Sequence, residues 1–152
     1  MRKKPKLCLA CSAGGHLQEM LQLKPVYSRF EHFFFTFKRA DSESLSKKEK
    51  VYFAERPARN PFSTLQTFAQ AWKVLEREKP DAIISTGADV AVPMLIAGKL
   101  KGARIVFIES FCRPSKPSVS GRIAYLLSDL FIVQWKKVRK FYPKAVFGGS
   151  IF

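Results

Sequence analysis

The sequence predicts an α/β domain of the Rossmann-like kind, with three layers and a mostly parallel sheet. Three observations lead to this fold class. Short apolar runs rich in β-branched and aromatic residues recur along the chain, stretches with helical apolar spacing separate them, and polar turns containing glycine follow several of them. Because parallel strands are joined by crossover connections, this alternation implies helices on both faces of the sheet.

The first half of the chain contributes three predicted strands, at residues 7–11, 31–37 and 51–53. A helix follows the first strand, over about residues 17–21. The charged residues 41–50 include three serines, and we expect them to form a mobile loop.

A long helix is predicted to begin at Asn60 and Pro61, because Asn caps helices and Pro fits the first turn. The helix ends near Lys79 and Pro80. Its apolar side chains recur at three- and four-residue spacing, so we expect them to face the core. They are Phe62, Leu65, Phe68, Ala69, Trp72 and Leu75.

The second half of the chain continues the alternation. After a strand at 82–85, Asp89 is placed to cap a helix that runs to about residue 100, where Lys101 and Gly102 end it. The remaining predicted elements are a strand at 104–108, a loop at 111–121, a helix at 120–127, a strand at 130–133, a short basic helix and a last strand at 145–147.

Length and composition predict a single domain over residues 1–152, because 17.3 kDa of chain with 47% hydrophobic residues can bury one sizeable core. Lys and Arg number 27 against 12 acidic residues, a formal charge of +15. Such a chain favours polyanionic partners: nucleic acid, nucleotide or lipid phosphates, or an anionic membrane face. The basic clusters are Arg2, Lys3, Lys4 and Lys6; Lys47, Lys48 and Lys50; and Lys136, Lys137, Arg139, Lys140 and Lys144.

Membrane contact is expected to be peripheral. Trp135, Phe141 and Tyr142 are interleaved with the last basic cluster, a mixture typical of membrane interfaces. No apolar stretch reaches the roughly 20 residues that a span needs, and the N-terminus lacks a signal-peptide pattern. We therefore expect the protein at the cytoplasmic face of the membrane.

Cys8 and Cys11 form a C-x-x-C motif that lies within a predicted strand. Side chains three residues apart in a strand point to opposite faces of the sheet, so the two sulfurs diverge. With Cys112 alone elsewhere, we predict neither a metal site nor a disulfide, and no cofactor.

Three polar turns follow predicted strands, at residues 12–16, 86–89 and 109–113. Ligands of parallel sheets bind beyond the carboxyl ends of the strands, so we expect one cleft to gather these turns. The first turn, Ser12-Ala13-Gly14-Gly15-His16, has the pattern of a phosphate-holding loop, since glycines let backbone N–H groups approach an anion at a helix start. His16 is available there for proton transfer; an ordinary strand-to-helix turn in which His16 caps the helix is the alternative.

Five segments, taken in order, resemble the PssD-type oligosaccharide biosynthesis family, which includes the membrane-associating subunit of the two-part transferase that adds the second N-acetylglucosamine to dolichol-linked sugar. They are residues 12–16, 84–93, 106–110, 130–135 and 141–146. The chain is also more distantly similar to the N-terminal domain of MurG, which shares the Gly-Gly-His loop and a histidine-glutamate turn at the place of Ile108 and Glu109.

The resemblance implies that residues 1–152 are the acceptor-side, N-terminal half of a GT-B glycosyltransferase, whose donor-binding half is a separate polypeptide. The partners it implies are that subunit, a polyprenyl-diphosphate-linked sugar acceptor, a UDP-sugar donor and an anionic membrane surface, with no nucleic acid. It also implies that His16 and Glu109 are catalytic. The substrate-binding residues that it implies are Ser12, Gly14, Gly15, Thr86, Gly87, Asp89, Ser110, Arg113 and Lys116.

Simpler roles stay open for several of these residues. Asp89 has the position of a helix cap, Glu109 that of a structural carboxylate, and Arg113 and Lys116 are either grips for a lipid diphosphate or solvent-exposed cations.

Two other classes of protein are weaker alternatives. A stand-alone nucleotide-binding oxidoreductase is disfavoured, because the first loop lacks G-x-G-x-x-G and no acidic residue ends the strand at 33–37 to bind a ribose. A nucleic-acid-binding module is supported by charge and aromatic residues alone, without a recognised motif.

Overall fold

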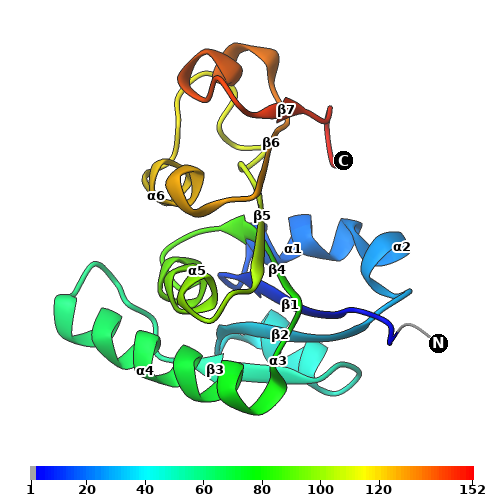
Figure 1. The fold of residues 1–152 in the computed structure, drawn as a ribbon, viewed down its shortest axis with the longest axis vertical. Coiled ribbons are helices and arrows are strands. Elements are labelled where there is room, and N and C mark those ends of the chain that lie inside the picture. Colours follow the sequence, from blue (N-terminus) through cyan, green and yellow to red (C-terminus); the bar gives the residue numbers. More distant parts are fainter. Residues whose placement is uncertain (1–2) are drawn as a thin grey trace.

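The computed structural model describes residues 3–152, so Arg2 of the first basic cluster lies outside the described residues. Seven strands form one sheet in the order β3-β2-β1-β4-β5-β6-β7, and every neighbouring pair is parallel. Figure 1 shows this row from β3 at the bottom to β7 at the top. The strands are β1 (Lys6–Cys11), β2 (Glu31–Phe37), β3 (Val51–Ala54), β4 (Ala82–Gly87), β5 (Arg104–Ile108), β6 (Leu130–Val133) and β7 (Val146–Phe147). The predicted Rossmann-like α/β fold is confirmed.

Helices cover both faces of the sheet. One face packs on α1 and on the first residues after it, and the other packs on α4, α5 and α6. The helices are α1 (Gly15–Gln22), α2 (Lys24–Tyr27), α3 (Ala40–Ser46), α4 (Pro61–Glu78), α5 (Ala91–Leu100), α6 (Val119–Leu127) and the 3₁₀ helix η1 (Lys136–Phe141). Cys8 belongs to one of these two cores and Cys11 to the other, so the two sulfurs diverge as predicted. Burial raises the pKa of the Cys11 thiol to about 12, which makes it inert at neutral pH.

The prediction of a mobile loop at 41–50 is wrong, because α3 occupies its first part. Ser42 is buried at the start of this helix, where its Oγ accepts from the Arg39 N–H (2.9 Å) and donates to the Phe37 carbonyl (2.8 Å). Leu45 packs against the core beneath α1. The helix thus depends on tertiary contacts that a serine-rich sequence does not reveal.

The predicted core face of α4 is also wrong in part. Phe62 is 70% exposed and Leu65 is 65% exposed, whereas Thr67, Ala71, Leu75 and Glu78 are buried. Thr67 is buried at low cost because its hydroxyl donates to the Glu55 carbonyl at 2.6 Å. The helix start was predicted correctly: the Asn60 side chain accepts from the N–H of Phe62.

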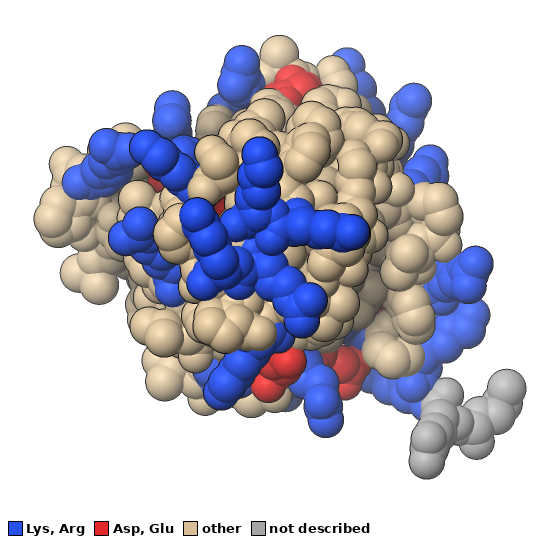
Figure 2. Space-filling model, turned by 90° about the horizontal axis from the view of Figure 1, so that it is seen from above, with Lys and Arg blue, Asp and Glu red and all other residues tan. Residues whose placement is uncertain are grey.

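The aromatic residues of the last basic cluster do not form the expected interface. Tyr142 is buried, and the Trp135 indole donates to the Phe111 carbonyl at 2.7 Å, so Phe141 is the exposed ring of the three. The cations remain exposed, and Figure 2, seen from the β7 end, shows Lys and Arg side chains gathered over this face. Within residues 3–152, none of the helices combines the length and apolar character that a membrane span requires.

Candidate functional site

A cleft of about 590 Å³ opens at the carboxyl ends of the strands, where β1 and β4 lie side by side and their crossovers leave in opposite directions. Its lining comes from all three predicted turns: Ser12 and His16 after β1, Asp89 after β4, and Ser110 and Arg113 after β5. The topology therefore brings these turns together as the sequence predicted.

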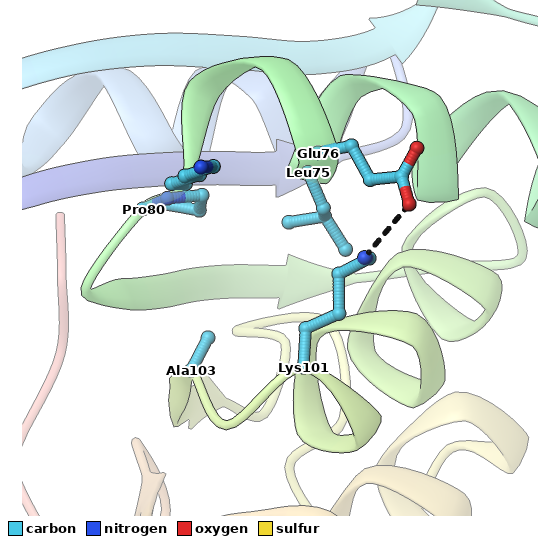
Figure 3. Close-up of a pocket in the computed structure, with 6 residues that line it drawn as sticks. Leu75, Glu76, Pro80, Lys101 and Ala103 are labelled. Atoms are coloured by element: carbon cyan, nitrogen blue, oxygen red, sulfur yellow. Dashed lines mark hydrogen bonds and ion pairs between the residues drawn. The ribbon is translucent and has the colours of Figure 1, made fainter.

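A second hollow, of about 630 Å³, lies at the opposite edge between the end of α4 and Lys101 (Figure 3). Its one acidic side chain, Glu76, is paired with Lys101 at 3.3 Å. This hollow contains no histidine, and it lies at the amino ends of the strands, where loops of this fold class do not carry a ligand site. The carboxyl-end cleft is the candidate site.

His16 is held in one orientation by the β4 turn. Its Nδ1 lies 2.8 Å from the Thr86 carbonyl oxygen, and the Thr86 hydroxyl donates to the His16 carbonyl at 2.7 Å. Because a carbonyl only accepts, Nδ1 carries the proton of the neutral ring, which leaves Nε2 as the basic nitrogen. His16 thus lines the cleft in the tautomer that a general base needs.

Thr86 and Gly87 lie behind the cleft and support His16. A Cβ at Gly87 would lie 3.4 Å from His16 Nδ1, and Gly87 has a φ of 113°, which favours glycine. Neither residue lines the cleft. The structure therefore places these two residues against the imidazole of His16, and their expected role in substrate binding stays a prediction.

The glycine turn is already occupied at one of its N–H groups. The Gly14 N–H donates to Oδ2 of Asp41, the second residue of α3, at 2.6 Å. A Cβ at Gly14 would lie 3.0 Å from Nη1 of Arg39, so this guanidinium lies directly beside the turn. The carboxylate of Asp41 stands where an anionic ligand of the Gly14 N–H would stand.

Asp89 does not cap α5 in the predicted way, because the helix begins one residue later, with Val90 at the cap position. Its Oδ1 accepts from the Val90 N–H at 2.9 Å and from the Ser12 hydroxyl at 3.2 Å. Its Oδ2 lies 3.6 Å from Nε of Arg56. Asp89 thus joins the first two turns and faces an arginine across the cleft.

Glu109 is buried and does not line the cleft. Its carboxylate accepts from the N–H groups of Ser110 and Ser118 at 3.1 Å each, from the Ser118 hydroxyl at 2.6 Å, and from the Tyr142 hydroxyl at 2.7 Å. Burial and the bond to Glu109 raise the pKa of Tyr142, so the tyrosine keeps its proton. This geometry favours the structural role of Glu109 over the catalytic one, since both oxygens already have donors.

Glu19, which sequence reasoning missed, also holds the loop after β5. From α1, its Oε1 accepts from the Ser110 hydroxyl at 3.0 Å and from the Phe111 N–H at 2.9 Å. Burial raises the pKa of Glu19, and its Oε2 has no hydrogen-bond partner among the described residues. The sequence did hold a signal for Glu19, because it lies three residues after His16 and therefore on the same side of the predicted helix.

Sequence reasoning also missed three arginines of the cleft, Arg39, Arg56 and Arg59, which come from the loops after β2 and β3. Lys116, expected beside Arg113, does not line the cleft. In residues 3–152 there is no cluster of three or more His, Cys, Asp or Glu side chains arranged to hold a metal ion.

Solved structures share this fold over less than half of their own length. MurG from Acinetobacter baumannii superposes with a TM-score of 0.72 over 88% of this chain and 43% of its own, at 16% identity. UDP-N-acetylglucosamine 2-epimerase from Rickettsia bellii superposes with a TM-score of 0.78 over 97% of this chain and 45% of its own, at 16% identity. The chain spans less than half of each solved chain, and its sheet and cleft define a GT-B-type Rossmann-like domain.

The chain belongs to the family of Alg14-like oligosaccharide biosynthesis proteins, whose family model matches residues 54–151. It is 29% identical to the human UDP-N-acetylglucosamine transferase subunit ALG14 over 99% of this chain and 84% of that protein. It is 27% identical to the UDP-N-acetylglucosamine--N-acetylmuramyl-(pentapeptide) pyrophosphoryl-undecaprenol N-acetylglucosamine transferase of Geobacillus kaustophilus, over 68% of this chain and 29% of that enzyme. The resemblance expected from the sequence is confirmed, and the chain is a glycosyltransferase-family protein.

Proposed function

We propose that this chain is the acceptor-side subunit of a two-part UDP-sugar transferase, and that residues 1–152 form one GT-B-type half whose donor-binding half is a separate polypeptide. Family membership supports this, since the human relative is named a transferase subunit. Its donor sugar is N-acetylglucosamine or a related UDP-sugar, and its acceptor is a sugar carried on a polyprenyl diphosphate.

One observation carries the proposal: His16 lines a cleft rich in arginine, and its Nδ1 is fixed on the Thr86 carbonyl, which leaves Nε2 as the basic nitrogen. In inverting sugar transfer, a base removes the proton of the acceptor hydroxyl as its oxygen attacks the anomeric carbon of the donor. The bond from that carbon to the diphosphate oxygen breaks, and UDP leaves with the electron pair. Nε2 takes that proton, and the Nδ1–H bond to Thr86 steadies the imidazolium that results. His16 is therefore the base in this proposal, and Glu109 positions the loop that carries Ser110 and Arg113.

An apolar rim at the mouth of the cleft supports peripheral binding to a membrane. Thr64 near the start of α4 and Val119 at the start of α6 line the cleft. Val119 is 72% exposed, and Phe62 and Leu65, neighbours of Thr64 along α4, are exposed as well. Rings and aliphatic chains at this position enter the lipid interface, while nearby cations meet anionic headgroups. A lipid-linked acceptor would then reach His16 without leaving the bilayer, at the cytoplasmic face.

The proposal is tested by co-expressing the chain with the donor-binding glycosyltransferase subunit of the same organism. The purified complex is expected to transfer N-acetylglucosamine from UDP-N-acetylglucosamine to a polyprenyl-diphosphate-linked acceptor. His16→Ala is expected to keep the complex and to lose transfer. Absence of both complex formation and donor consumption would overturn the proposal.

The membrane part has its own test, co-sedimentation with vesicles that contain anionic lipid. Phe62→Ser combined with Leu65→Ser is expected to reduce the bound fraction. Leu100→Ser removes an equally exposed leucine, 69% exposed at the far end of α5, and is expected to leave it unchanged. Equal binding by both variants and the wild type would refute the apolar rim as the contact surface.

A further inference from the structure

Three guanidinium groups converge on the cleft from two neighbouring loops. Arg39 follows β2, and Arg56 and Arg59 lie between β3 and α4; all three line the cleft. Within residues 3–152, neither Arg39 nor Arg59 forms an ion pair, and Arg56 has one long contact, 3.6 Å to Asp89. Together with Arg113 from the loop after β5, these three arginines face a cleft whose lining includes one carboxylate, that of Asp89. An anionic ligand would balance the excess of positive charge.

The glycine turn has one N–H group already in use within the fold. Its Gly14 N–H is bonded to the Asp41 carboxylate, which fills the position of a phosphate oxygen. The Arg39 guanidinium lies beside the same turn, close enough to meet a Cβ placed on Gly14. Asp41 therefore takes one backbone donor of the glycine turn, and the arginine side chains supply the positive charge beside it.

Each of the other two arginines is positioned by the fold. The Arg56 guanidinium lies 5.3 Å from the centre of the Phe37 ring, a cation–π contact that holds it over the end of β2. Ala58 and Arg59 have φ values of 47° and 59°, a left-handed conformation that costs energy in residues with a Cβ. Such strain is concentrated at functional sites, and here it turns the Arg59 side chain into the cleft.

We propose that Arg39, Arg56 and Arg59 bind the diphosphate of the acceptor, an inference that rests on the proposed function for the identity of its lipid and sugar ends. Guanidinium groups bind phosphate oxygens through paired, charge-assisted hydrogen bonds. A diphosphate that joins a sugar to a lipid carries one negative charge on each phosphate, and three arginines around one cleft can engage both. The sugar on this diphosphate would then lie within the cleft that His16 lines.

The test is a calorimetric titration of the full chain, without its partner, with geranyl diphosphate, inorganic pyrophosphate and UDP at one ionic strength. The variant Arg39→Gln, Arg56→Gln, Arg59→Gln is compared with Lys136→Gln, Lys137→Gln, Arg139→Gln. The second variant loses the same charge from η1, on the basic face seen in Figure 2. Thermal unfolding checks that both variants fold.

We expect the arginine variant to bind geranyl diphosphate about 100-fold more weakly than the wild type, and the η1 variant to stay within about threefold of it. UDP is expected to bind no more tightly than inorganic pyrophosphate. Equal weakening by both variants, or no weakening by the arginine variant, would overturn the proposal. Tighter binding of UDP than of geranyl diphosphate would also overturn it, because the site would then belong to the donor.

The test of the arginine site and the test of the proposed transferase function can fail independently. If the chain binds geranyl diphosphate through these arginines but the complex transfers no sugar, the function fails and the site stands. If the complex transfers sugar and the arginine variant both binds and transfers like the wild type, the site fails and the function stands.

Discussion

The two ends of the parallel sheet use their charged residues differently. At the amino ends, Glu78 bonds to Lys6, Lys50 and the Tyr52 hydroxyl, and Asp129 pairs with Lys99 at 3.1 Å. At the carboxyl ends, the buried carboxylates Glu19 and Glu109 bond to hydroxyls and backbone N–H groups. Glu19 and Glu109 therefore hold loops in place without pairing with the arginines of the cleft, and the long contact of Arg56 with Asp89 is the ion pair that these arginines form within residues 3–152.

The two histidines of the chain repeat this contrast. His32 lies near the start of β2, where its Nε2 is 3.1 Å from the Glu49 carboxylate and its Nδ1 is 2.9 Å from the Phe30 carbonyl. His16 lines the cleft, and its hydrogen bond to a carbonyl uses Nδ1 alone. Both ring nitrogens of His32 serve the fold, whereas one nitrogen of His16 remains for chemistry.

The largest effect is expected at His16. His16→Asn can keep a donor at the place of Nδ1 for the Thr86 carbonyl, but it has no basic nitrogen. We expect the transfer rate of the complex to fall about 10²- to 10⁴-fold, the range that general base catalysis supplies. His32→Asn is the matched control at the opposite end and is expected to keep transfer within about twofold of the wild type. A similar loss in both variants would remove the contrast between the two ends.

A change at Glu109 is expected to act on stability. Glu109→Ala leaves the buried Tyr142 hydroxyl and the buried Ser118 N–H without their acceptor, at a cost of about 3 kcal/mol in the free energy of unfolding. Urea unfolding measures this cost. Glu109→Gln retains an acceptor oxygen and is expected to lose less stability and to keep transfer activity. Loss of transfer in a fully stable Glu109→Gln protein would return Glu109 to the role of a catalytic residue.

The pH dependence of stability separates the two kinds of carboxylate. The lysine and tyrosine bonds outweigh burial and lower the pKa of Glu78 from 4.5 to about 2. Its ionised form is favoured by folding, so its contribution is complete above pH 4.5 and is lost as the pH falls toward 2. Burial raises the pKa of Glu19 above 4.5, so folding favours its protonated form, and that contribution is lost as the pH rises.

The opposite pH dependences of these two contributions are measured by urea unfolding from about pH 3 to about pH 8. We expect the stability advantage of the wild type over Glu78→Gln to shrink as the pH falls. Relative to Glu19→Gln, the wild type is expected to lose stability as the pH rises past the ordinary glutamate pKa. If the stability difference from the wild type changed with pH in the same direction for Glu78→Gln and Glu19→Gln, the contrast between a lysine-paired Glu78 and a buried Glu19 would be contradicted.

Much of the fold could be predicted from the sequence, because strands in a covered parallel sheet read as continuous apolar runs. The runs at 31–37 and 104–108 coincide with β2 and β5. The wrong predictions share one cause: polar side chains are buried because residues distant in the sequence satisfy their hydrogen bonds. Ser42 begins α3 through the end of β2, and Thr67 and Glu78 take the buried face of α4 that apolar spacing assigned to Phe62 and Leu65.

The candidate site was predictable where it follows the strands and not where it depends on side chains from neighbouring loops. The topology rule gathers Ser12, Asp89 and Ser110 correctly. No local pattern indicates that Asp41 reaches the Gly14 N–H or that Glu19 reaches Ser110, 91 positions away. Such contacts appear only once the crossovers have placed α1 and α3 against the cleft.

The smallest expected effects come from removing one exposed cation at each end. Lys101 pairs with Glu76 and lies 4.0 Å from the centre of the Trp72 ring, and exposed contacts of these kinds contribute about 1 kcal/mol or less each. Lys101→Gln is therefore expected to lower the free energy of unfolding by about 1 kcal/mol and to leave diphosphate binding unchanged.

Arg59→Gln removes the same charge from the cleft, where Arg59 has no ion pair within residues 3–152. Its left-handed backbone is already tolerated, so we expect its unfolding free energy to stay within about 0.5 kcal/mol of the wild type. Binding of geranyl diphosphate is expected to weaken about tenfold, since one charge-assisted contact is lost. Urea unfolding and calorimetry on the two variants test this crossed result. The paired Lys101 should contribute to stability and not to ligand binding, whereas Arg59 should contribute to ligand binding and not to stability. This is the result that the difference in ion pairing between the two ends of the sheet predicts.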